Sequence, residues 1–322
     1  MKIGYLIRVR PDLEDIIPAD VESYARVHVG DDGRYSDEDL AKIKDVDAFV
    51  IGMEPVNEQI LAAAPNLKIV QRLGVGYETL DLDATAKRQI PACNIEGVNK
   101  EAVAEHAMTL MLALAKKLPQ ASAFTQQADW PAARKLTSQS FELKGKTLGI
   151  IGFGNTGSSL AKRAHPFEMD IVYHDPKDVN ADVAKQLGAK AVSLETLLRT
   201  ADIVSVCTDL NDTSRNMIDE KAIALMGPKT TFICCARGGI IDEAAMSKAL
   251  HEGRIAQAGI DVFEIEPIRA DNPLIGAPNC ILTAHVAGVA HETTMRIWDW
   301  AHENVRAVVQ RRERPQWIRN GV

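Results

Sequence analysis

The stretch Thr147-Leu148-Gly149-Ile150-Ile151-Gly152-Phe153-Gly154-Asn155-Thr156-Gly157 decides the fold of this chain. An apolar run typical of a strand leads into three glycines spaced G-x-G-x-x-G, and residues 158–164 then have the pattern of a helix. In such a turn Gly152 permits the tight bend, Gly154 lets the backbone approach a pyrophosphate, and Gly157 lets the helix pack against the strand. The free N–H groups at the helix N-terminus favour phosphate. The spacing therefore predicts a dinucleotide-binding strand–turn–helix.

A second strand pattern at residues 170–175 supports this interpretation because it ends in an acid. Glycine-rich turns are common, so an ordinary strand–turn–helix is the alternative. Asp175, however, follows Gly157 by 18 residues, where a carboxylate meets the 2′-hydroxyl of an adenosine ribose. The same carboxylate would repel the 2′-phosphate of NADP, so the sequence predicts NAD as the cofactor. Lys177 is the one nearby cation and leaves some tolerance of NADP open.

Composition excludes several classes of partner. The chain has 322 residues, enough for about two domains of ~100–200 residues each. It is 46% hydrophobic and 25% charged, as in ordinary globular proteins. Its net charge of −7 offers no basic surface to nucleic acid or to an anionic membrane. The longest apolar helical run, residues 107–115, is far shorter than the ~18 residues of a membrane span.

The cysteines and the N-terminus favour a cytoplasmic protein without a metal site. Residues 1–8 become charged too soon for a secretory signal peptide and read as a first strand. The five cysteines are an odd number and lack metal-ligand spacing. Cys234 and Cys235 are adjacent, which suggests redox chemistry, but the apolar run 231–236 favours two small buried hydrophobes. A reducing compartment is the natural location of such cysteines.

Strand and helix patterns alternate along the chain, which is typical of parallel βαβ units. We therefore expect one α/β domain before the glycine-rich turn and a second one after it. In the first, strand patterns cover residues 2–9, 24–29, 47–51 and 67–73, with helices from residue 36 and at 58–64. In the second, helices are expected at 181–187, 194–200, 220–226 and 243–251, strands at 203–207, 231–236, 255–261 and 280–284, and a last helix at 291–311.

The segment between the two α/β patterns has a different character. Asn99 is placed to cap a helix over residues 100–117, whose Ala, Met and Leu face we expect to be buried between domains or subunits. Residues 119–146 have no clear periodicity and contain Pro119, Trp130 and Pro131. An irregular connection of that length is unusual inside a compact domain. The interpretation is an arm that packs on a partner subunit.

Three polar residues follow the late strands of the second α/β pattern: Arg237, Glu266 and His285. The carboxyl ends of such strands face the nucleotide crevice, so the three side chains should converge where a nicotinamide ring lies. Singly, each has an ordinary explanation as a salt bridge, a turn residue or a structural histidine. Together they suit hydride transfer, with the histidine as acid/base, the carboxylate fixing its tautomer, and the arginine orienting a substrate carboxylate or carbonyl.

A glycine pair in the first α/β pattern is a second candidate site. The strand at 67–73 runs into Gly74-Val75-Gly76, and glycines at a strand end can expose backbone N–H groups to an anion. A plain turn explains these glycines equally well. Arg72 is either a contact for a distal acidic group of the ligand or a salt-bridge partner.

Several motifs together carry a resemblance to the D-2-hydroxyacid dehydrogenase family, in its phosphoglycerate dehydrogenase-like branch, over almost the whole chain. They are Gly74-Val75-Gly76, Val103-Ala104-Glu105-His106, Glu142-Leu143-Lys144-Gly145-Lys146-Thr147, the glycine-rich turn, Ala236-Arg237-Gly238-Gly239, Asp261-Val262-Phe263-Glu264 and Thr283-Ala284-His285-Val286-Ala287-Gly288. The resemblance implies an α/β protein of two doubly wound parallel-sheet domains. A flavodoxin-like substrate domain would comprise residues 1–98 and 288–322. A Rossmann NAD-binding domain would comprise residues 99–287, with a dimerisation arm at about 119–146 in a homodimer.

The resemblance also implies roles for individual residues. Arg237, Glu266 and His285 would be catalytic. The cofactor contacts would be Gly152, Gly154, Asn155, Thr156, Gly157, Asp175, Thr208, Cys235, Ala236 and Asp261. The backbone around Val75 and Gly76 would bind the substrate carboxylate, and Arg237 would contact the substrate too. Apart from the resemblance, Arg72 and Tyr77 are the other expected substrate contacts. The activity would interconvert a small 2-hydroxy acid and a 2-keto acid, with NAD as cofactor.

Some positions depart from the family pattern, and two other functions stay open. Ala284 replaces a usual proline, Cys234 a usual asparagine, and residues 207–210 a usual His-x-Pro-Leu. Tyr77-Glu78 replaces a common Asp-Asn pair in the loop that would face the substrate, so the usual substrates are not assured. An NAD-sensing, corepressor-like binding protein is one alternative, although retention of all three catalytic residues argues against it. A phosphite-type dehydrogenase is the other, whereas Glu266 argues against formate because the formate enzymes carry glutamine there.

Overall fold

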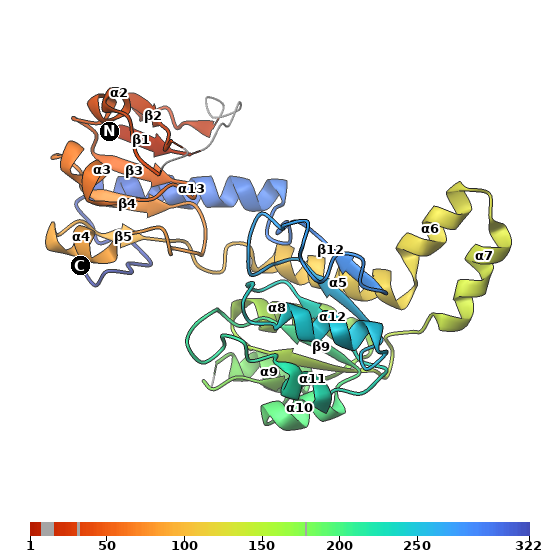
Figure 1. Ribbon diagram of the computed structural model, residues 1–322. Helices are drawn as coiled ribbons and strands as arrows, with labels where there is room; N and C mark the ends of the chain where they lie inside the picture. The colour runs from red at the N-terminus through yellow and green to blue at the C-terminus, as the bar shows by residue number, and fades with distance from the viewer. Residues whose placement is uncertain (8–15, 31–32, 178) are drawn as a thin grey trace. The chain divides into compact units, whose positions relative to one another are not determined.

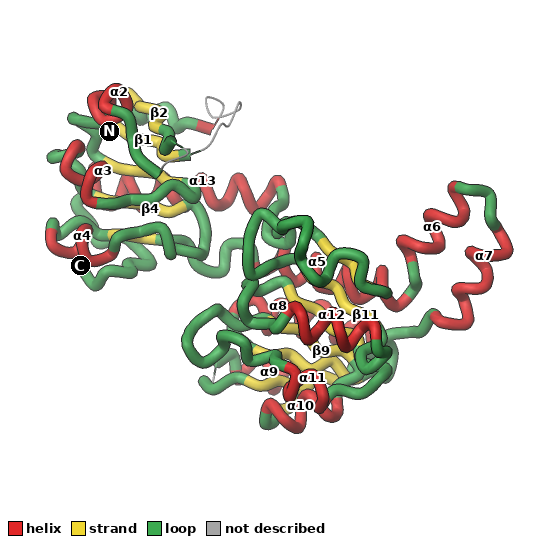
Figure 2. Tube along the Cα trace, viewed as in Figure 1, coloured by secondary structure: helices red, strands yellow, loops and turns green. Residues whose placement is uncertain are grey.

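The computed structural model describes residues 1–7, 16–30, 33–177 and 179–322. The chain divides into two compact units, one formed by Met1–Val98 with Ala290–Val322 and the other by Asn99–Val289. Each unit combines a sheet with helices (Figures 1 and 2). The two-domain α/β fold predicted from the sequence is confirmed.

The first unit is built on a five-stranded parallel sheet of order β2-β1-β3-β4-β5. This 2-1-3-4-5 order is that of flavodoxin-like proteins. The central strand β3 is buried at every position, as expected for a parallel strand covered on both faces. The strands are β1 (Lys2–Leu6), β2 (Ser23–Val27), β3 (Ala48–Ile51), β4 (Ile69–Arg72) and β5 (Ala92–Cys93).

Four described helices cover this sheet: α2 (Asp37–Lys42), α3 (Glu58–Ala63), α4 (Leu82–Lys87) and α13 (His291–Val309). Each of the three short helices begins at a side-chain cap, because Ser36, Asn57 and Asp81 accept hydrogen bonds from N–H groups of the first turn. The long C-terminal helix α13 buries Trp298 and Val305 in one core of the unit. The chain thus returns to its first sheet at its end.

A buried histidine of α13 gives this unit a predictable response to pH. His302 is 2% exposed, its Nε2 lies 2.8 Å from Tyr5 Oη, and burial lowers its pKa from 6.5 to about 4. The unfolded chain binds a proton here that the folded chain does not, so stability falls as the pH drops from about 6.5 towards 4. The expected loss is at most ~3 kcal/mol. Denaturant titrations across this window should show a shallower pH dependence for His302→Gln, and equal dependences would contradict the assignment.

The second unit is built on a seven-stranded parallel sheet of order β12-β11-β10-β9-β6-β7-β8. The order reverses between β6 and β9, which is the point where doubly wound sheets bind nucleotides. The strands are β6 (Thr147–Ile151), β7 (Asp170–His174), β8 (Lys190–Ala191), β9 (Ile203–Val206), β10 (Thr231–Cys234), β11 (Gln257–Ile260) and β12 (Cys280–Leu282).

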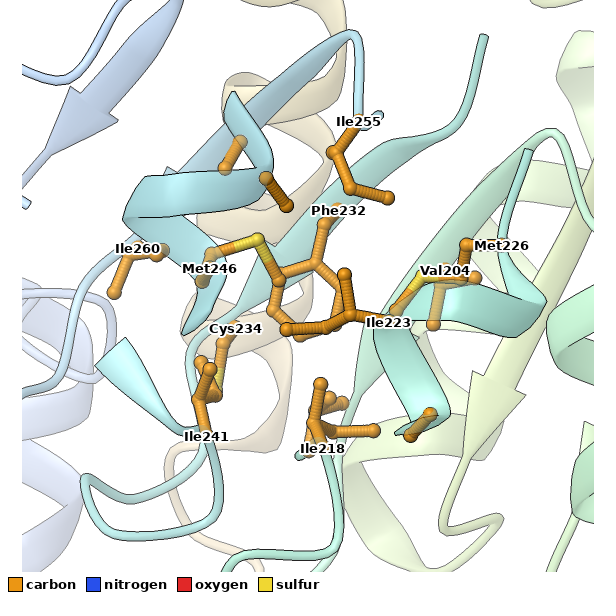
Figure 3. Packing of buried hydrophobic residues seen from close by; sticks show 14 of the residues in the cluster. Val204, Ile218, Ile223, Met226, Phe232, Cys234, Ile241, Met246, Ile255 and Ile260 are labelled. Carbon is orange, nitrogen blue, oxygen red and sulfur yellow. The ribbon is translucent and has the colours of Figure 1, made fainter. Parts of the chain in front are cut away.

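Most helices of this unit pack on the two faces of the sheet, whereas the two at residues 118–135 extend away from it (Figure 1). The helices are α5 (Lys100–Ala115), α6 (Leu118–Gln126), α7 (Trp130–Lys135), α8 (Asn155–Ala164), α9 (Ala181–Leu187), α10 (Leu194–Thr200), α11 (Glu220–Leu225) and α12 (Glu243–His251), with short 3-10 turns at Leu136–Gln139 and His165–Phe167. Figure 3 shows Phe232 of β10 packed between Ile223 of α11 and Met246 of α12. Cys234 lies in the same cluster as a free thiol whose pKa burial raises to about 12. It is the small buried hydrophobe expected from the sequence.

Three local expectations were wrong or incomplete. The stretch expected to be irregular contains helices α6 and α7, each with a proline in its first turn, where proline is well tolerated. Neither helix buries a residue, so no apolar periodicity could reveal them.

Asn99 does precede α5, but its side chain does not cap the helix. The Asn99 amide instead lies against Gly288. Strands β5 and β8 are two residues long, too short for a recognisable pattern. Residues 8–9 of the first expected strand lie outside the described residues.

Candidate active site

The glycine-rich turn follows β6 at the switch point of the second sheet, and each glycine has a separate physical reason. Gly152 has φ +90°, and a Cβ there would come within 2.8 Å of Thr208 N. A Cβ on Gly157 would come within 2.0 Å of Gly152 O, so only glycine lets α8 pack this closely. A Cβ on Gly154 would meet nothing within 4 Å, so the backbone faces open space there. This is the cradle that a pyrophosphate requires.

The N-terminus of α8 opens onto the same space. Gly154 is the N-cap residue and supplies no side chain to the helix, so the first N–H groups, of Asn155 and Thr156, are left for a ligand. Thr208 lies beside Gly152, directly after β9. Cys235 and Ala236 directly follow β10, and because the Cys235 side chain is buried, a cofactor contact there would come from the backbone. The predicted cofactor residues of this unit thus follow the strands β6, β9 and β10.

Asp175 lies at the end of β7 and touches the glycine-rich turn. Its Oδ2 accepts a hydrogen bond from Phe153 N at 2.8 Å, and its Oδ1 accepts one from Lys177 N at 2.9 Å. A carboxylate has about four acceptor sites, so both oxygens keep capacity for ribose hydroxyls. The turn and the acid together fit a dinucleotide with an unmodified ribose.

Glu266 and His285 form a hydrogen-bonded pair. Glu266 Oε2 lies 2.7 Å from His285 Nδ1, and Glu266 Oε1 accepts from Phe263 N at 2.9 Å. With Nδ1–H directed at the carboxylate, Nε2 is the nitrogen left to exchange a proton with a substrate. The His285 side chain is 46% exposed, so a substrate can reach that nitrogen.

Arg237 lies on the loop after β10, next to the loop that carries Glu266. A Cβ on Gly238 would come within 1.8 Å of Phe263 O, so the two loops are in backbone contact at a position that only glycine allows. Arg237 Nη1 donates to Ala236 O at 2.8 Å, and among the described residues no carboxylate lies within 4.0 Å of this guanidinium. Its remaining donors are available for an anionic or carbonyl oxygen.

Asp261 holds the loop that presents His285. It is fully buried, and its carboxylate accepts from Thr283 Oγ1 at 2.5 Å, Val286 N at 3.0 Å and Ala287 N at 2.9 Å. Its backbone oxygen accepts from His285 N at 2.8 Å. His285 has φ +52°, a left-handed conformation that a residue with a side chain adopts only where its surroundings enforce it. Asp261 supplies much of that enforcement.

His106 of α5 supports the same network, a role that sequence reasoning missed. Its Nε2 lies 3.0 Å from Thr283 Oγ1 and 3.6 Å from Asp261 Oδ1. Thr283 and His106 both lie in motifs that carry the family resemblance, which was the available signal. The predicted cofactor contact of Asp261 stays a prediction, since Oδ2 accepts only one hydrogen bond from the described residues and keeps acceptor capacity.

The Gly74-Val75-Gly76 loop of the first unit presents two N–H groups in one direction. Gly74 O accepts from Ile95 N at 2.9 Å, and Val75 O accepts from Asn94 Nδ2 at 2.6 Å. In a planar trans peptide the N–H points opposite to the C=O, so the N–H groups of Val75 and Gly76 face away from residues 94–95. Within the described ranges neither N–H has an acceptor. Two adjacent free N–H groups suit a carboxylate.

The other predicted substrate residues lie around this loop. Arg72 ends β4 and is buried, with Nη1 donating to Leu73 O at 3.0 Å and Nη2 lying 2.6 Å from Met53 Sδ. Tyr77 is 39% exposed, and the Arg319 guanidinium lies 5.3 Å from the centre of its ring. Glu78 folds back over Gly76, so that a Cβ there would meet its Oε2 at 2.6 Å. This carboxylate is the feature of the loop that most affects an incoming anion.

No group of three or more His, Cys, Asp or Glu side chains is arranged to hold a metal ion within the described residues. Of the helices in the described part of the chain, none is both long and apolar enough to cross a membrane.

Comparisons with known proteins identify the family of this chain. Residues 108–287 match the family profile described as "D-isomer specific 2-hydroxyacid dehydrogenase, NAD binding domain". The glyoxylate reductase of Korarchaeum cryptofilum is 36% identical over 270 residues, covering 83% of this chain and 81% of that protein. The D-3-phosphoglycerate dehydrogenase of Archaeoglobus fulgidus is 35% identical over 82% of this chain, but this covers only 50% of that protein.

A solved structure extends the similarity to the whole fold. The D-lactate dehydrogenase of Aquifex aeolicus, complexed with NAD and lactic acid, superposes with a TM-score of 0.81 at 25% identity, covering 96% of this chain and 95% of that one. The glycine-rich turn, the acid after β7 and the Glu266–His285 pair all lie in the matched residues. The chain therefore belongs to the D-isomer specific 2-hydroxyacid dehydrogenases, NAD-dependent oxidoreductases that transfer a hydride between NAD(H) and 2-hydroxy or 2-keto acids.

Proposed function

We propose that this enzyme reduces small 2-keto acids such as glyoxylate, with His285 as the acid, Glu266 as its partner and Arg237 as the orienting residue. The Glu266–His285 hydrogen bond, which leaves Nε2 exposed, is the observation that carries the proposal. The similarity to a glyoxylate reductase favours a small substrate. In the reverse direction His285 would accept the proton of a 2-hydroxy acid.

Each of these groups has one role in the proposed reduction. Bound NADH supplies a hydride to the keto carbon. His285 Nε2 delivers a proton to the carbonyl oxygen, which yields a 2-hydroxy acid and NAD. Glu266 stabilises the imidazolium that starts this step. Arg237 donates to the substrate's carbonyl or carboxylate oxygen. We assign the substrate carboxylate to the N–H groups of Val75 and Gly76, with Arg72 and Tyr77 nearer the substrate side chain.

We further propose that NAD is preferred over NADP, because Asp175 places a carboxylate where a 2′-phosphate would lie and Lys177 contributes its N–H to that carboxylate. The test of both proposals is a panel of 2-keto acids assayed by loss of NADH or NADPH absorbance. Turnover of glyoxylate with a higher kcat/KM for NADH is expected. Binding of NADH without turnover of any 2-keto acid would favour an NAD-sensing protein, and a higher kcat/KM with NADPH would overturn the cofactor preference.

The Glu266–His285 pair makes a prediction about pH. Reduction requires the imidazolium form, which the Glu266 carboxylate stabilises across the 2.7 Å hydrogen bond. Glu266→Gln keeps the shape but removes the charge, so the alkaline limb of the kcat/KM profile for reduction should move to lower pH. An unchanged profile in this variant would separate Glu266 from the proton transfer. Glu264→Gln, on the same loop but without a contact to His285, is the matched control.

We also infer a homodimer in which the arm, residues 119–146, packs on a second copy of this chain. Helices α6 and α7 bury no residue, and Leu118 and Trp130 are 59% and 66% exposed. Helices this short gain their stability from packing. They extend away from the sheet of their own unit (Figure 1).

We also propose that the enzyme is located in the reducing cytoplasm, since all five cysteines are free.

The arm gives a prediction about assembly. Trp130→Glu should weaken dimerisation at least about tenfold, because it places a charge in a buried interface. Sedimentation equilibrium measures this directly. Ile275→Glu, which changes a 49% exposed apolar residue outside the arm, should leave the dimer intact. A wild-type monomer at micromolar concentration, or equal effects of both variants, would contradict the inference.

A further inference from the structure

The last residues of the chain pair with the edge strand of the first sheet. Arg319 N donates to Ala92 O at 2.8 Å, and Asn94 N donates to Trp317 O at 3.3 Å. Cys93 and Ile318 form an antiparallel bridge between these bonds. We call residues 316–320 the C-terminal segment. It lies antiparallel to β5, a strand of only two residues, on the edge of β5 that does not pair with β4.

Side chains at both ends of the C-terminal segment fix its position. Asn320 accepts from Ala92 N at 3.2 Å and donates to Ile90 O at 2.8 Å. Trp317 stacks on Trp300 of α13, with ring centres 4.7 Å apart and an interplanar angle of 21°. Because its backbone is fixed at both ends, the C-terminal segment can hold a side chain in one position.

That side chain is Arg319, which connects the segment to the loop. Its Nε donates to Asn94 Oδ1 at 2.8 Å, its Nη2 pairs with Glu96, and its guanidinium lies 5.3 Å from the ring centre of Tyr77. Asn94 in turn donates from Nδ2 to Val75 O at 2.6 Å. A continuous path of polar contacts therefore runs from the end of the chain to the peptide between Val75 and Gly76.

The path has a fixed direction because arginine can only donate. Asn94 must present its oxygen to Arg319, which leaves its nitrogen for Val75 O. Without Arg319, the Asn94 oxygen loses the donor that fixes it, so the Asn94 nitrogen holds Val75 O less firmly. The orientation of the Val75–Gly76 peptide, and hence of the Gly76 N–H, depends on this hydrogen bond from Asn94 to Val75 O. Tyr77, which follows Gly76, is held by the same guanidinium.

We propose that Arg319 is a positioning residue for the substrate carboxylate, acting through Asn94 on the Gly76 N–H and through Tyr77 on the end of the loop. The inference rests on the proposed assignment of that carboxylate to Val75 and Gly76. All described contacts of Arg319 are with residues of the first unit. Arg319 therefore affects substrate affinity and leaves proton transfer and cofactor binding unchanged.

The test compares Arg319→Met with Arg314→Met in the full-length enzyme. Arg314 lies in the same terminal region, is exposed and makes none of these contacts, so it controls for the loss of one positive charge. The readouts are KM for glyoxylate, the Kd of oxalate for the enzyme–NADH complex, kcat, and the Kd of NADH. Arg319→Met should raise KM and the oxalate Kd about tenfold, the cost of one lost hydrogen bond to a charged group, with kcat and the NADH Kd within about twofold.

Two further variants keep the outcome decisive. Asn94→Ala should raise KM by a similar factor, and the double variant should be no worse than the worse single one, because both act on the same peptide. Arg319→Lys restores a donor and should recover part of the affinity. Equal KM values for Arg319→Met and Arg314→Met, additive effects with Asn94→Ala, or a fall in kcat at unchanged KM would each overturn the inference. If the wild-type enzyme reduces no 2-keto acid, the proposed function fails instead, and oxalate binding alone then decides the role of Arg319.

Discussion

His285→Ala is expected to lower kcat for 2-keto acid reduction by at least about 10²-fold, the usual contribution of a positioned acid/base group. In the wild type, Glu266 occupies Nδ1 at 2.7 Å, so a proton on Nε2 is held ready for the substrate oxygen. Alanine removes that proton donor, and the alkoxide that forms during hydride addition must then be protonated by water. The glycine-rich turn and Asp175 are untouched, so NADH affinity should stay near the wild-type value.

Two comparisons make this prediction specific. His251→Ala removes a histidine whose ring, among the described residues, bonds only to Ser247 O of its own helix, and it should keep wild-type kcat. The NADH Kd, measured by fluorescence, should be equal in all three proteins. Near-normal kcat in His285→Ala would remove this residue from the mechanism, whatever the effect on KM.

Asp261→Asn should lower kcat by about 10–10²-fold, because it releases the loop that carries His285. The carboxylate accepts from Thr283 Oγ1, Val286 N and Ala287 N with its two oxygens. Asparagine replaces one oxygen with an N–H₂ group, which would face a donor at a fully buried site. The N–H of Val286 or Ala287 then loses its acceptor, so the loop just after the left-handed His285 is held less firmly. An unsatisfied buried group also costs ~1–3 kcal/mol, so the melting temperature should fall.

The kinetic pattern of Asp261→Asn separates two roles of this residue. If Asp261 mainly positions His285, kcat falls and KM for NADH changes little. If it mainly contacts the cofactor, as the family resemblance implies, KM for NADH rises while kcat is retained. Thr283→Val is the matched variant, since it removes one partner of Asp261 and leaves both loop N–H groups bound. It should show a smaller loss of kcat in the same direction.

The sequence was sufficient for the parts of this enzyme that depend on local pattern. The glycine spacing at 152–157 predicted the turn after β6, and alternating strands and helices predicted two parallel sheets. Glu266 and His285 were predicted to converge because the carboxyl ends of parallel strands share one edge, and the structure places them in contact. Neither prediction required knowledge of contacts between distant segments. The turn is local, and the convergence of Glu266 and His285 follows from strand direction alone.

The parts that the sequence could not predict depend on contacts between distant segments. Arg319 reaches Asn94 from a position 225 residues away, and no motif marks either residue. Asp261 was expected as a cofactor contact, yet its hydrogen bonds with residues 285–287 appear only once β11 and β12 are neighbours. Helices α6 and α7 bury no residue and so leave no periodic pattern. Tertiary geometry, rather than residue type, decides the first two cases, and the lack of a buried face decides the third.

The most direct test of the central claim, that His285 and its partners promote hydride transfer from NADH to a 2-keto acid, uses NADH deuterated at the transferring position of C4. Mass spectrometry of the product of glyoxylate reduction then shows whether the deuteride arrives at C2. We predict a 2-hydroxy acid carrying one deuterium at C2 from the wild-type enzyme, and far less of it from His285→Ala at equal NADH occupancy. Consumption of labelled NADH without deuterium at C2, or equal labelling by both proteins, would contradict the account.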